Sequence, residues 1–136
     1  MEEQLNPSKV GMITEYKCII FLLEQGWNVL IPEGNYTKYD LVIEKNNNFY
    51  RIQCKHSIER DTGFEVNTRY YIRSTSKKQK YTKEDCDYFM TEFKGKFYIF
   101  PIFGTTATKF WTVPPKQNHS CKMAKDFLAE DILEKL

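Results

Sequence analysis

Two segments in which apolar and polar residues alternate, 40–44 and 49–55, flank a short polar run that contains Asn46 and Asn47. Asparagine tolerates the positive φ that a two-residue hairpin turn requires. The pattern therefore predicts a β-hairpin with Asn46 and Asn47 as its loop. Because slipping the register by one residue would scramble the apolar face, the pattern also predicts how the two strands pair.

The predicted register gives the hairpin one apolar face and one polar face. The apolar face holds Leu41, Ile43, Tyr50, Ile52 and Cys54, and the polar face holds Asp40, Glu44, Arg51, Gln53 and Lys55, with Val42 among them. Asp40 faces Gln53 across the strands, and Lys55 lies two residues further on the same side. Carboxylate and neutral oxygens are the ligands that Mg²⁺ prefers. A nearby lysine can orient or deprotonate an attacking water, or stabilise charge on a phosphate. The alternative is a solvated sheet face with ordinary polar residues.

Residues 11–25 have helical periodicity, with Gly26 as the stop. One arc of the helix gathers Met12, Ile13, Tyr16, Ile19, Ile20, Leu22 and Leu23, with Thr14 and Cys18 on the opposite side. Glu15 falls at the edge of this apolar arc, where an ionised carboxylate is costly to bury. Glu15 is therefore a candidate functional residue, the alternative being a glutamate that extends to solvent or pairs with a lysine.

Further elements follow from the same reasoning. Strands are predicted over 27–31, 64–73 and 97–103, and helices over 82–92, with Thr82 as N-cap, and over 121–135. The order of elements predicts an α/β fold with a central mixed β-sheet flanked by helices. A length of 136 residues predicts a single domain, 1–136.

Several classes of protein are disfavoured by the composition. No apolar run approaches the roughly 18 residues of a membrane span, so no membrane association is expected. The N-terminus has no secretory signal, which predicts a cytoplasmic location. The 4 cysteines are far apart in sequence, which argues against a zinc knuckle or a thioredoxin motif. Cys18 and Cys54 lie in apolar surroundings and are expected to be buried thiols.

Positive charge is concentrated in one segment, although the net charge is only +2. Residues 66–83 contain no Asp or Glu and carry Arg69, Arg73, Lys77, Lys78, Lys80 and Lys83. Tyrosines such as Tyr71 are interleaved with these cations. The arginines are the better candidates for base edges and the lysines for phosphates. A basic solvated loop is the alternative.

The order Glu15, Tyr39-Asp40 and Gln53-Cys54-Lys55 resembles the core of PD-(D/E)xK nucleases, which have a helix Glu, a strand Asp and (D/E)-x-K on the next strand. Gln53 departs from the general pattern. It is similar to a subgroup found among group I intron homing endonucleases, in which a Gln takes that place. The resemblance is clear over about residues 11–56 and weaker to about 103.

This resemblance implies a restriction-endonuclease-like core and an Mg²⁺-dependent DNA endonuclease, with Mn²⁺ as a possible substitute. Asp40 would be the main metal ligand, Gln53 a second through its side-chain oxygen, and the Cys54 carbonyl a third. Lys55 would be the catalytic lysine. Glu15 would help to order the metal or its water. Replacing an acid by Gln53 removes one negative charge, which should weaken binding of a divalent cation.

The leading prediction is a site-specific hydrolase of double-stranded DNA of the homing, mobile-element or phage type. One site per chain and two strands to cut predict a homodimer or homotetramer. The C-terminal helix, with Phe127, Leu128 and Ile132, is a candidate interface, and a core role is equally open. The alternatives are a Holliday-junction resolvase or restriction endonuclease on the same fold, a catalytically decayed DNA-binding module, and an interaction protein that uses the acidic C-terminal helix.

Overall fold

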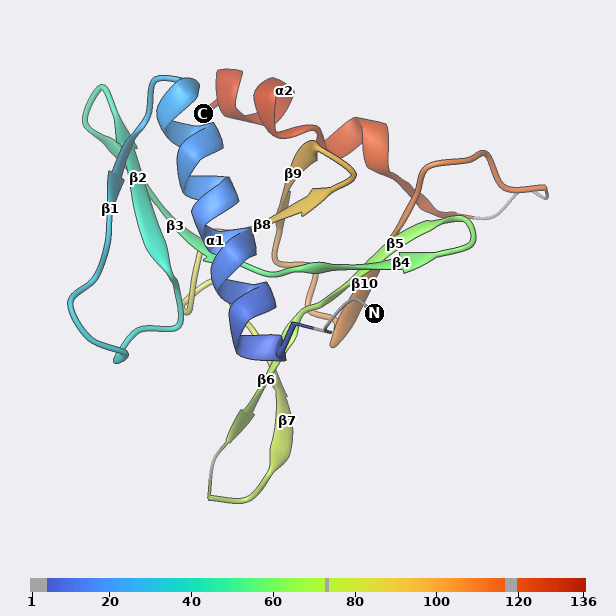
Figure 1. The fold of residues 1–136 in the computed structure, drawn as a ribbon, viewed down its shortest axis with the longest axis horizontal. Helices are drawn as coiled ribbons and strands as arrows, with labels where there is room; N and C mark the ends of the chain where they lie inside the picture. The colour runs from blue at the N-terminus through green and yellow to red at the C-terminus, as the bar shows by residue number, and fades with distance from the viewer. Residues whose placement is uncertain (1–4, 73, 117–119) are drawn as a thin grey trace.

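A five-stranded mixed sheet forms the centre of the molecule in the computed structural model, which describes residues 5–72, 74–116 and 120–136 (Figure 1). Its strands, in spatial order, are β1 (Asn28–Leu30), β2 (Leu41–Lys45), β3 (Asn48–Cys54), β8 (Tyr88–Phe93) and β9 (Lys96–Pro101). β3 and β8 are parallel, and the other neighbours are antiparallel. A mixed α/β fold with a central sheet is thus confirmed.

A second sheet and a separate ribbon complete the strands. The second sheet has the order β11 (Lys122–Met123), β10 (Ala107–Trp111), β5 (Gly63–Asn67) and β4 (Ser57–Arg60). The ribbon consists of β6 (Arg69–Ile72) and β7 (Lys77–Lys80), paired only with each other. Figure 1 shows this ribbon projecting away from the rest of the molecule.

The helices lie against the five-stranded sheet. α1 (Pro7–Glu24) starts at Asn6, whose side-chain oxygen accepts a hydrogen bond from the Lys9 N–H at 2.9 Å. Such an N-cap satisfies a backbone donor that has no partner within the helix. α1 contacts β1, β3 and β8, and α2 (Ala129–Glu134) follows the 3₁₀ helix η1 (Ala124–Phe127) and contacts β9. α1 therefore covers the strands that carry the predicted site (Figure 1).

The predicted hairpin register is confirmed. Leu41 pairs with Ile52 and Glu44 with Phe49, as expected for a two-residue loop. Asn46 and Asn47 have φ values of 53° and 66°, so both residues adopt the left-handed conformation of a tight hairpin turn. The hairpin buries its apolar face against the core.

The side of α1 predicted to face the core was wrong for most of its residues: of the predicted arc, only Leu22 is buried and Ile19 half-buried against the core. Thr14, Cys18 and Leu22 are the buried residues of the helix. Met12, Ile13, Tyr16, Ile20 and Leu23 keep between 41% and 58% of their surface exposed. Small side chains at positions 14 and 18 let the helix approach the sheet, and most of the larger apolar residues are left on the outer side.

The predicted helix over 82–92 was also wrong. Its second half is β8, in which Met90 and Thr91 are fully buried, and its first half is a turn. Thr82 does act as a cap, but of the turn, because its Oγ1 accepts a hydrogen bond from the Glu84 N–H at 3.3 Å. The Thr82 N–H donates in return to Asp85 Oδ2 at 2.8 Å. A central strand buried on both faces loses the alternation that marks a strand in sequence.

The other elements follow the predictions in part. Strands over 27–31 and 97–103 correspond to β1 and β9. The single strand over 64–73 is divided into β5 and β6, which belong to different sheets. The C-terminal helix is confined to 129–134, and strands β4, β7, β10 and β11 were not predicted.

Two hydrophobic clusters hold the layers together. The first lies between the helices and the five-stranded sheet and contains Cys18, Leu22, Ile43 and Ile52. The second lies between the sheets and is rich in phenylalanine, with Phe64 and Phe110 stacked at 5.2 Å. Cys18 and Cys54 are buried free thiols, as predicted. No described helix is both long and apolar enough to cross a membrane.

Candidate active site

The hairpin holds Asp40 beside Gln53 and Cys54. The Asp40 N–H donates to the Ile52 carbonyl at 2.9 Å, which extends the pairing of β2 and β3 by one residue. Asp40 Oδ2 in turn accepts a hydrogen bond from the Cys54 N–H at 2.8 Å. The carboxylate is thereby fixed on the strand that carries the rest of the predicted motif. The proximity predicted from the register is present.

Glu15 joins this group from α1. A hollow of about 470 Å³ is lined by Glu15, Asp40, Gln53 and Cys54, together with the N-terminal turns of α1. A second hollow, of about 190 Å³, shares Glu15 and Asp40 and is closed by the loop at 31–39. The two acidic side chains thus stand between two concave surfaces. The structure brings together Glu15, Asp40 and Gln53, as the sequence predicted.

The electrostatics of the hollow favour a cation. Burial raises the pKa of Asp40, and the Cys54 N–H and the Lys55 ammonium oppose that increase. Burial and the neighbouring Asp40 carboxylate raise the pKa of Glu15. Both acids therefore favour the protonated form more than exposed carboxyls do, and a divalent cation bound beside them would favour the ionised form.

The available donors suit a hard cation. No group of three or more His, Cys, Asp or Glu residues capable of holding a metal occurs among the described residues. A ligand set at this hollow would therefore combine the carboxylates with neutral oxygens, namely the Gln53 amide and the Cys54 carbonyl. Oxygen donors of this kind fit Mg²⁺, which keeps several waters and needs few protein ligands.

Lys55 directs its ammonium toward the base of the ribbon. Burial lowers the pKa of Lys55, whereas the Asp40 carboxylate acts in the opposite direction. Lys55 Nζ donates to the Arg69 carbonyl at 3.5 Å and lies 5.3 Å from the centre of the Tyr81 ring. No described carboxylate forms a salt bridge with Lys55. The Lys55 ammonium is therefore near enough to feel the Asp40 charge, but it forms no ion pair with a described carboxylate.

The predicted DNA-contacting residues map largely to the ribbon. Arg69, Tyr71, Lys77, Lys78 and Lys80 lie on β6 and β7, whereas Arg73 lies outside the described residues. Tyr71 pairs with Lys78, and Arg69 pairs with Lys80. Since alternate residues of a strand share a face, Arg69, Tyr71, Lys78 and Lys80 occupy one side of the ribbon. Arg69 lowers the pKa of Tyr71 through a hydrogen bond.

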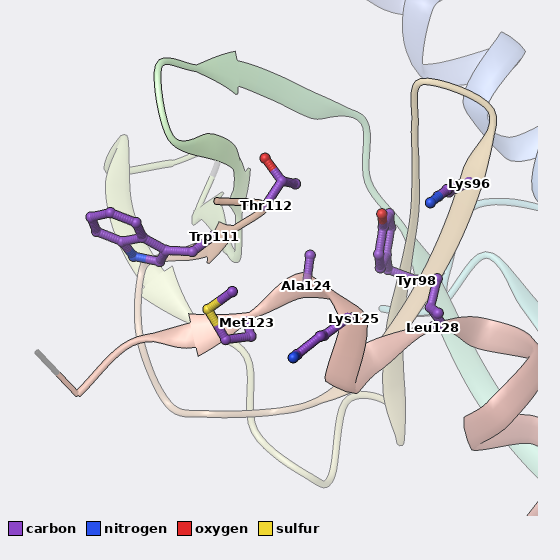
Figure 2. Close-up of a pocket in the computed structure, with 8 residues that line it drawn as sticks. All are labelled: Lys96, Tyr98, Trp111, Thr112, Met123, Ala124, Lys125 and Leu128. Atoms are coloured by element: carbon purple, nitrogen blue, oxygen red, sulfur yellow. The ribbon is translucent and has the colours of Figure 1, made fainter. Parts of the chain in front are cut away.

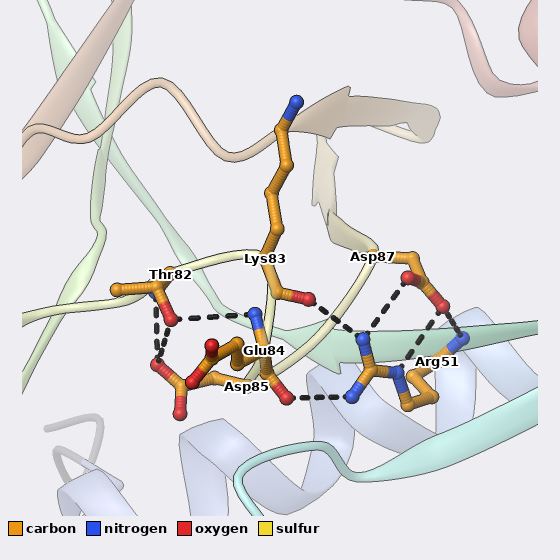
Figure 3. A network of polar contacts seen from close by, with 6 residues as sticks. All are labelled: Arg51, Thr82, Lys83, Glu84, Asp85 and Asp87. Carbon is orange, nitrogen blue, oxygen red and sulfur yellow. Dashed lines mark hydrogen bonds and ion pairs between the residues drawn. The ribbon is translucent and has the colours of Figure 1, made fainter.

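An ion pair between Arg51 and Asp87, which was not predicted, fixes the turn at 82–87 beside the site (Figure 3). Arg51 Nη2 lies 3.1 Å from Asp87 Oδ1, and the Arg51 N–H donates to Asp87 Oδ2 at 2.7 Å. The same guanidinium donates to the carbonyls of Glu84 at 2.6 Å and Lys83 at 2.7 Å. The only sequence signal was that Arg51 shares the polar face of the hairpin with Gln53. Tyr81, at the start of this turn, is one of the tyrosines interleaved with the cations of residues 66–83, but no sequence pattern predicted its contact with Lys55.

A separate pocket lies away from the acidic hollow (Figure 2). It has a volume of about 140 Å³ and is lined by Lys96, Tyr98, Trp111, Thr112, Met123, Ala124, Lys125 and Leu128. Its lining includes two lysines and no carboxylate. It therefore lacks the chemistry of a cation site, and the acidic hollow remains the candidate active site.

Comparison with known proteins agrees with this geometry. A sequence model of the PD-(D/E)XK endonuclease family matches residues 5–130, so the chain belongs to that family. Membership of this family makes the chain a nuclease, which is a class of hydrolase.

A solved structure with a similar fold is that of a bacterial homing endonuclease, I-Ssp6803I. The TM-score is 0.74 at 24% sequence identity, and the alignment covers 96% of this chain and 95% of that chain. At that identity the likeness establishes the fold, and the restriction-endonuclease-like core is thereby confirmed. A sequence search among curated proteins gives no match.

Proposed function

We propose that the protein is a metal-dependent endonuclease that hydrolyses phosphodiester bonds of double-stranded DNA at specific sites. The observation that supports this most is that Glu15, Asp40 and Gln53 line one hollow, in a chain of the PD-(D/E)XK endonuclease family. We assign residues 1–136 to one endonuclease domain. The site-specific character is inferred from the likeness to a homing endonuclease.

The residues of the hollow have distinct proposed roles. Asp40 is the main ligand of Mg²⁺ or Mn²⁺, with the Gln53 side-chain oxygen and the Cys54 carbonyl beside it, and Glu15 acts directly or through water. A divalent cation in this position supplies stabilisation of the charge that develops on the scissile phosphate. Lys55 holds the attacking water or the phosphate through its ammonium group. A bound cation would lower the raised pKa values of Glu15 and Asp40 and keep both acids ionised.

The ribbon is the proposed DNA contact. The major groove of B-DNA admits a two-stranded β-ribbon, and β6–β7 projects from the molecule as such an element (Figure 1). Lys77, Lys78 and Lys80 would neutralise phosphates. Arg69, Tyr71 and Arg73 are proposed to contact the DNA as well, Arg69 and Arg73 as candidates for guanine edges. Because lysine contacts to phosphates release counterions, binding should weaken steeply with salt.

We also propose that the protein is a homodimer or homotetramer, and that α1 forms an interface between two copies. α2 packs on β9 of its own chain with Ala129 and Leu133 buried, so the C-terminal helix does not present the main exposed apolar face. On α1, Ile20 and Leu23 are exposed apolar residues beyond Met12 and Tyr16, which line the acidic hollow itself. Uncharged side chains such as these can pair with those of a second copy about a twofold axis without opposing like charges.

An Ile20→Glu variant tests this interface, with Val113→Glu as a control at an exposed apolar residue on another element. Multi-angle light scattering should show a smaller assembly for Ile20→Glu and no change for Val113→Glu. A wild-type protein that is monomeric at micromolar concentration, or an Ile20→Glu variant with the wild-type mass, would contradict the assignment.

Cleavage assays test the proposed function itself. A plasmid library with a randomised insert and a panel of branched DNAs would be incubated with Mg²⁺ or Mn²⁺, and the new ends sequenced. The wild type should cut, and Asp40→Ala and Lys55→Ala should not. Asp61→Ala and Lys135→Ala, at exposed positions, should cut like the wild type. A preference for branched substrates would instead identify a junction resolvase.

One specific observation supports a second candidate. Gln53 is neutral, which leaves the hollow with one negative charge fewer than the general motif of the family provides. This favours a DNA-binding module with a decayed catalytic site as the alternative. It predicts salt-sensitive DNA binding by the wild type with no cutting of either substrate set in Mg²⁺ or Mn²⁺.

A further inference from the structure

The ammonium of Lys55 is held by the two ends of the ribbon. Its hydrogen-bond acceptor is the carbonyl of Arg69, the first residue of β6, at 3.5 Å. Its aromatic neighbour is Tyr81, the residue that follows β7, with the ring centre at 5.3 Å. Within about 6 Å, a lysine above an aromatic ring is attracted by the negative face of the ring. Both contacts therefore come from the base of the element proposed to bind DNA.

Tyr81 is itself firmly placed. It is 6% exposed and packs edge-on against Tyr70 of β6 at 5.1 Å and against Phe89 of β8 at 5.1 Å. Tyr70 in turn carries Lys38 Nζ at 3.5 Å from its ring centre. The Tyr81 ring thus connects the ribbon to a central strand of the five-stranded sheet. Packing on both sides fixes the position of the Tyr81 ring, so the face that contacts the Lys55 ammonium is also fixed.

The other end of the base is fixed by hydrogen bonds. The Thr68 N–H donates to the Thr106 carbonyl at 3.1 Å, and Arg69 Nη1 donates to the same carbonyl at 3.3 Å. Thr68 Oγ1 donates to the Thr105 carbonyl at 2.7 Å. The Arg69 carbonyl that faces Lys55 is therefore anchored to the loop before β10. Two independently anchored groups define where the ammonium of Lys55 lies.

From these contacts we infer that Tyr81 is a positioning residue for Lys55, whose ammonium it holds at the base of the ribbon. This inference rests on the proposed nuclease function. Tyr81 does not touch the reacting atoms. It acts through its ring face, which holds the ammonium while the outer part of the same ribbon contacts DNA. The ring is the functional part, so phenylalanine should replace tyrosine and an aliphatic residue should not.

Paired variants at position 81 test the inference. Tyr81→Leu keeps an apolar side chain but removes the ring, and it should slow single-turnover cleavage about 3- to 30-fold, the range expected for losing a partly buried cation–π contact. Its Kd for DNA should not change, since the exposed ribbon is intact. Tyr81→Phe should cleave at close to the wild-type rate. Tyr81→Leu with wild-type cleavage, or Tyr81→Phe as slow as Tyr81→Leu, would overturn the inference.

A spectroscopic measurement needs neither cleavage nor a variant. In the wild-type protein, the ring current of Tyr81 should shift the Cε protons of Lys55 upfield of those of exposed lysines. Lys55 resonances at the ordinary position would overturn the inference even if Tyr81→Leu failed to fold. If the wild type does not cleave DNA while the upfield shift is present, the proposed function fails and the contact stands.

Discussion

The Asp40 carboxylate accepts a hydrogen bond from the backbone N–H of Cys54 at 2.8 Å. This bond crosses from the start of β2 to the end of β3 and brings the acid beside Gln53 and Lys55. The pairing of the strands and this hydrogen bond fix the position of the acid. Fixed polar groups of this kind are the condition for efficient electrostatic catalysis.

The raised pKa of Glu15 gives a prediction on pH. Burial and the Asp40 carboxylate raise this pKa in the folded state above the usual 4.5. The associated stability is present below the unfolded pKa and is lost as pH rises through the folded pKa. In EDTA, Glu15→Gln should therefore flatten this loss and raise the Tm at neutral pH by about 2–4 °C. Thermal melts followed by circular dichroism, at steps of about 0.5 unit between pH 4 and pH 7, measure the Tm of the wild type and of Glu15→Gln as a function of pH.

Glu24→Gln is the matched control, because Glu24 is an exposed glutamate on the same helix. It should leave the pH dependence of the Tm unchanged. Identical curves of Tm against pH for Glu15→Gln and the wild type would contradict a raised pKa of Glu15 in the folded protein.

Restoring an acid at position 53 should change metal affinity. Gln53→Glu adds a negative charge to a hollow that already holds Glu15 and Asp40. We expect Mg²⁺ to bind about tenfold more tightly, because one more charged ligand strengthens a site for a hard cation. The metal-free protein should become less stable through added repulsion. Titration calorimetry and melts in EDTA measure the two effects. Gln25→Glu, at an exposed position, is the control.

The ribbon lysines should determine the salt dependence of DNA binding. Lys77→Ala and Lys78→Ala should each reduce the slope of log K against log salt by about 0.9, the value for one lost phosphate contact. Lys135→Ala, at the exposed C-terminal end, should not alter the slope. Fluorescence anisotropy over a range of salt concentrations gives these slopes. An unchanged slope in both ribbon variants would place the DNA elsewhere.

Arg51 should stabilise the turn at 82–87. Arg51→Ala removes the ion pair with Asp87 and the bonds to the Glu84 and Lys83 carbonyls. We expect the free energy of unfolding to fall by about 1–3 kcal/mol, since the part-buried Asp87 carboxylate and two exposed carbonyls lose a charged donor. Urea denaturation measures this loss. Arg60→Ala, which breaks a more exposed pair with Glu65, should cost at most about 1 kcal/mol.

The parts of the fold that sequence predicted are those set by local rules. The hairpin register followed from Asn46 and Asn47 at a tight turn and from the alternation around them. That register alone brought Asp40 to Gln53, so the centre of the candidate site was predicted. Glu15 was singled out because a carboxylate borders an apolar arc, and it does line the hollow.

The parts that sequence missed depend on long-range packing. The core-facing side of α1 is set by the close approach of Thr14 and Cys18 to the sheet, and the larger apolar residues outside are free for a different contact. β8 is a central strand buried on both faces, and its composition does not distinguish it from a buried helix. The role of Tyr81 beside Lys55 depends on how the ribbon returns to the sheet. No local pattern carries that information.

Binding of a divalent cation tests the central claim most directly, because it needs no DNA target. Mn²⁺ would be titrated into the protein and free Mn²⁺ followed by electron paramagnetic resonance, for the wild type, Asp40→Asn and Asp61→Asn. We predict that the wild type and Asp61→Asn, altered at an exposed aspartate, bind Mn²⁺ and that Asp40→Asn does not. Equal binding by all three proteins, or binding by none, would contradict the assignment of this hollow as the metal site of the nuclease.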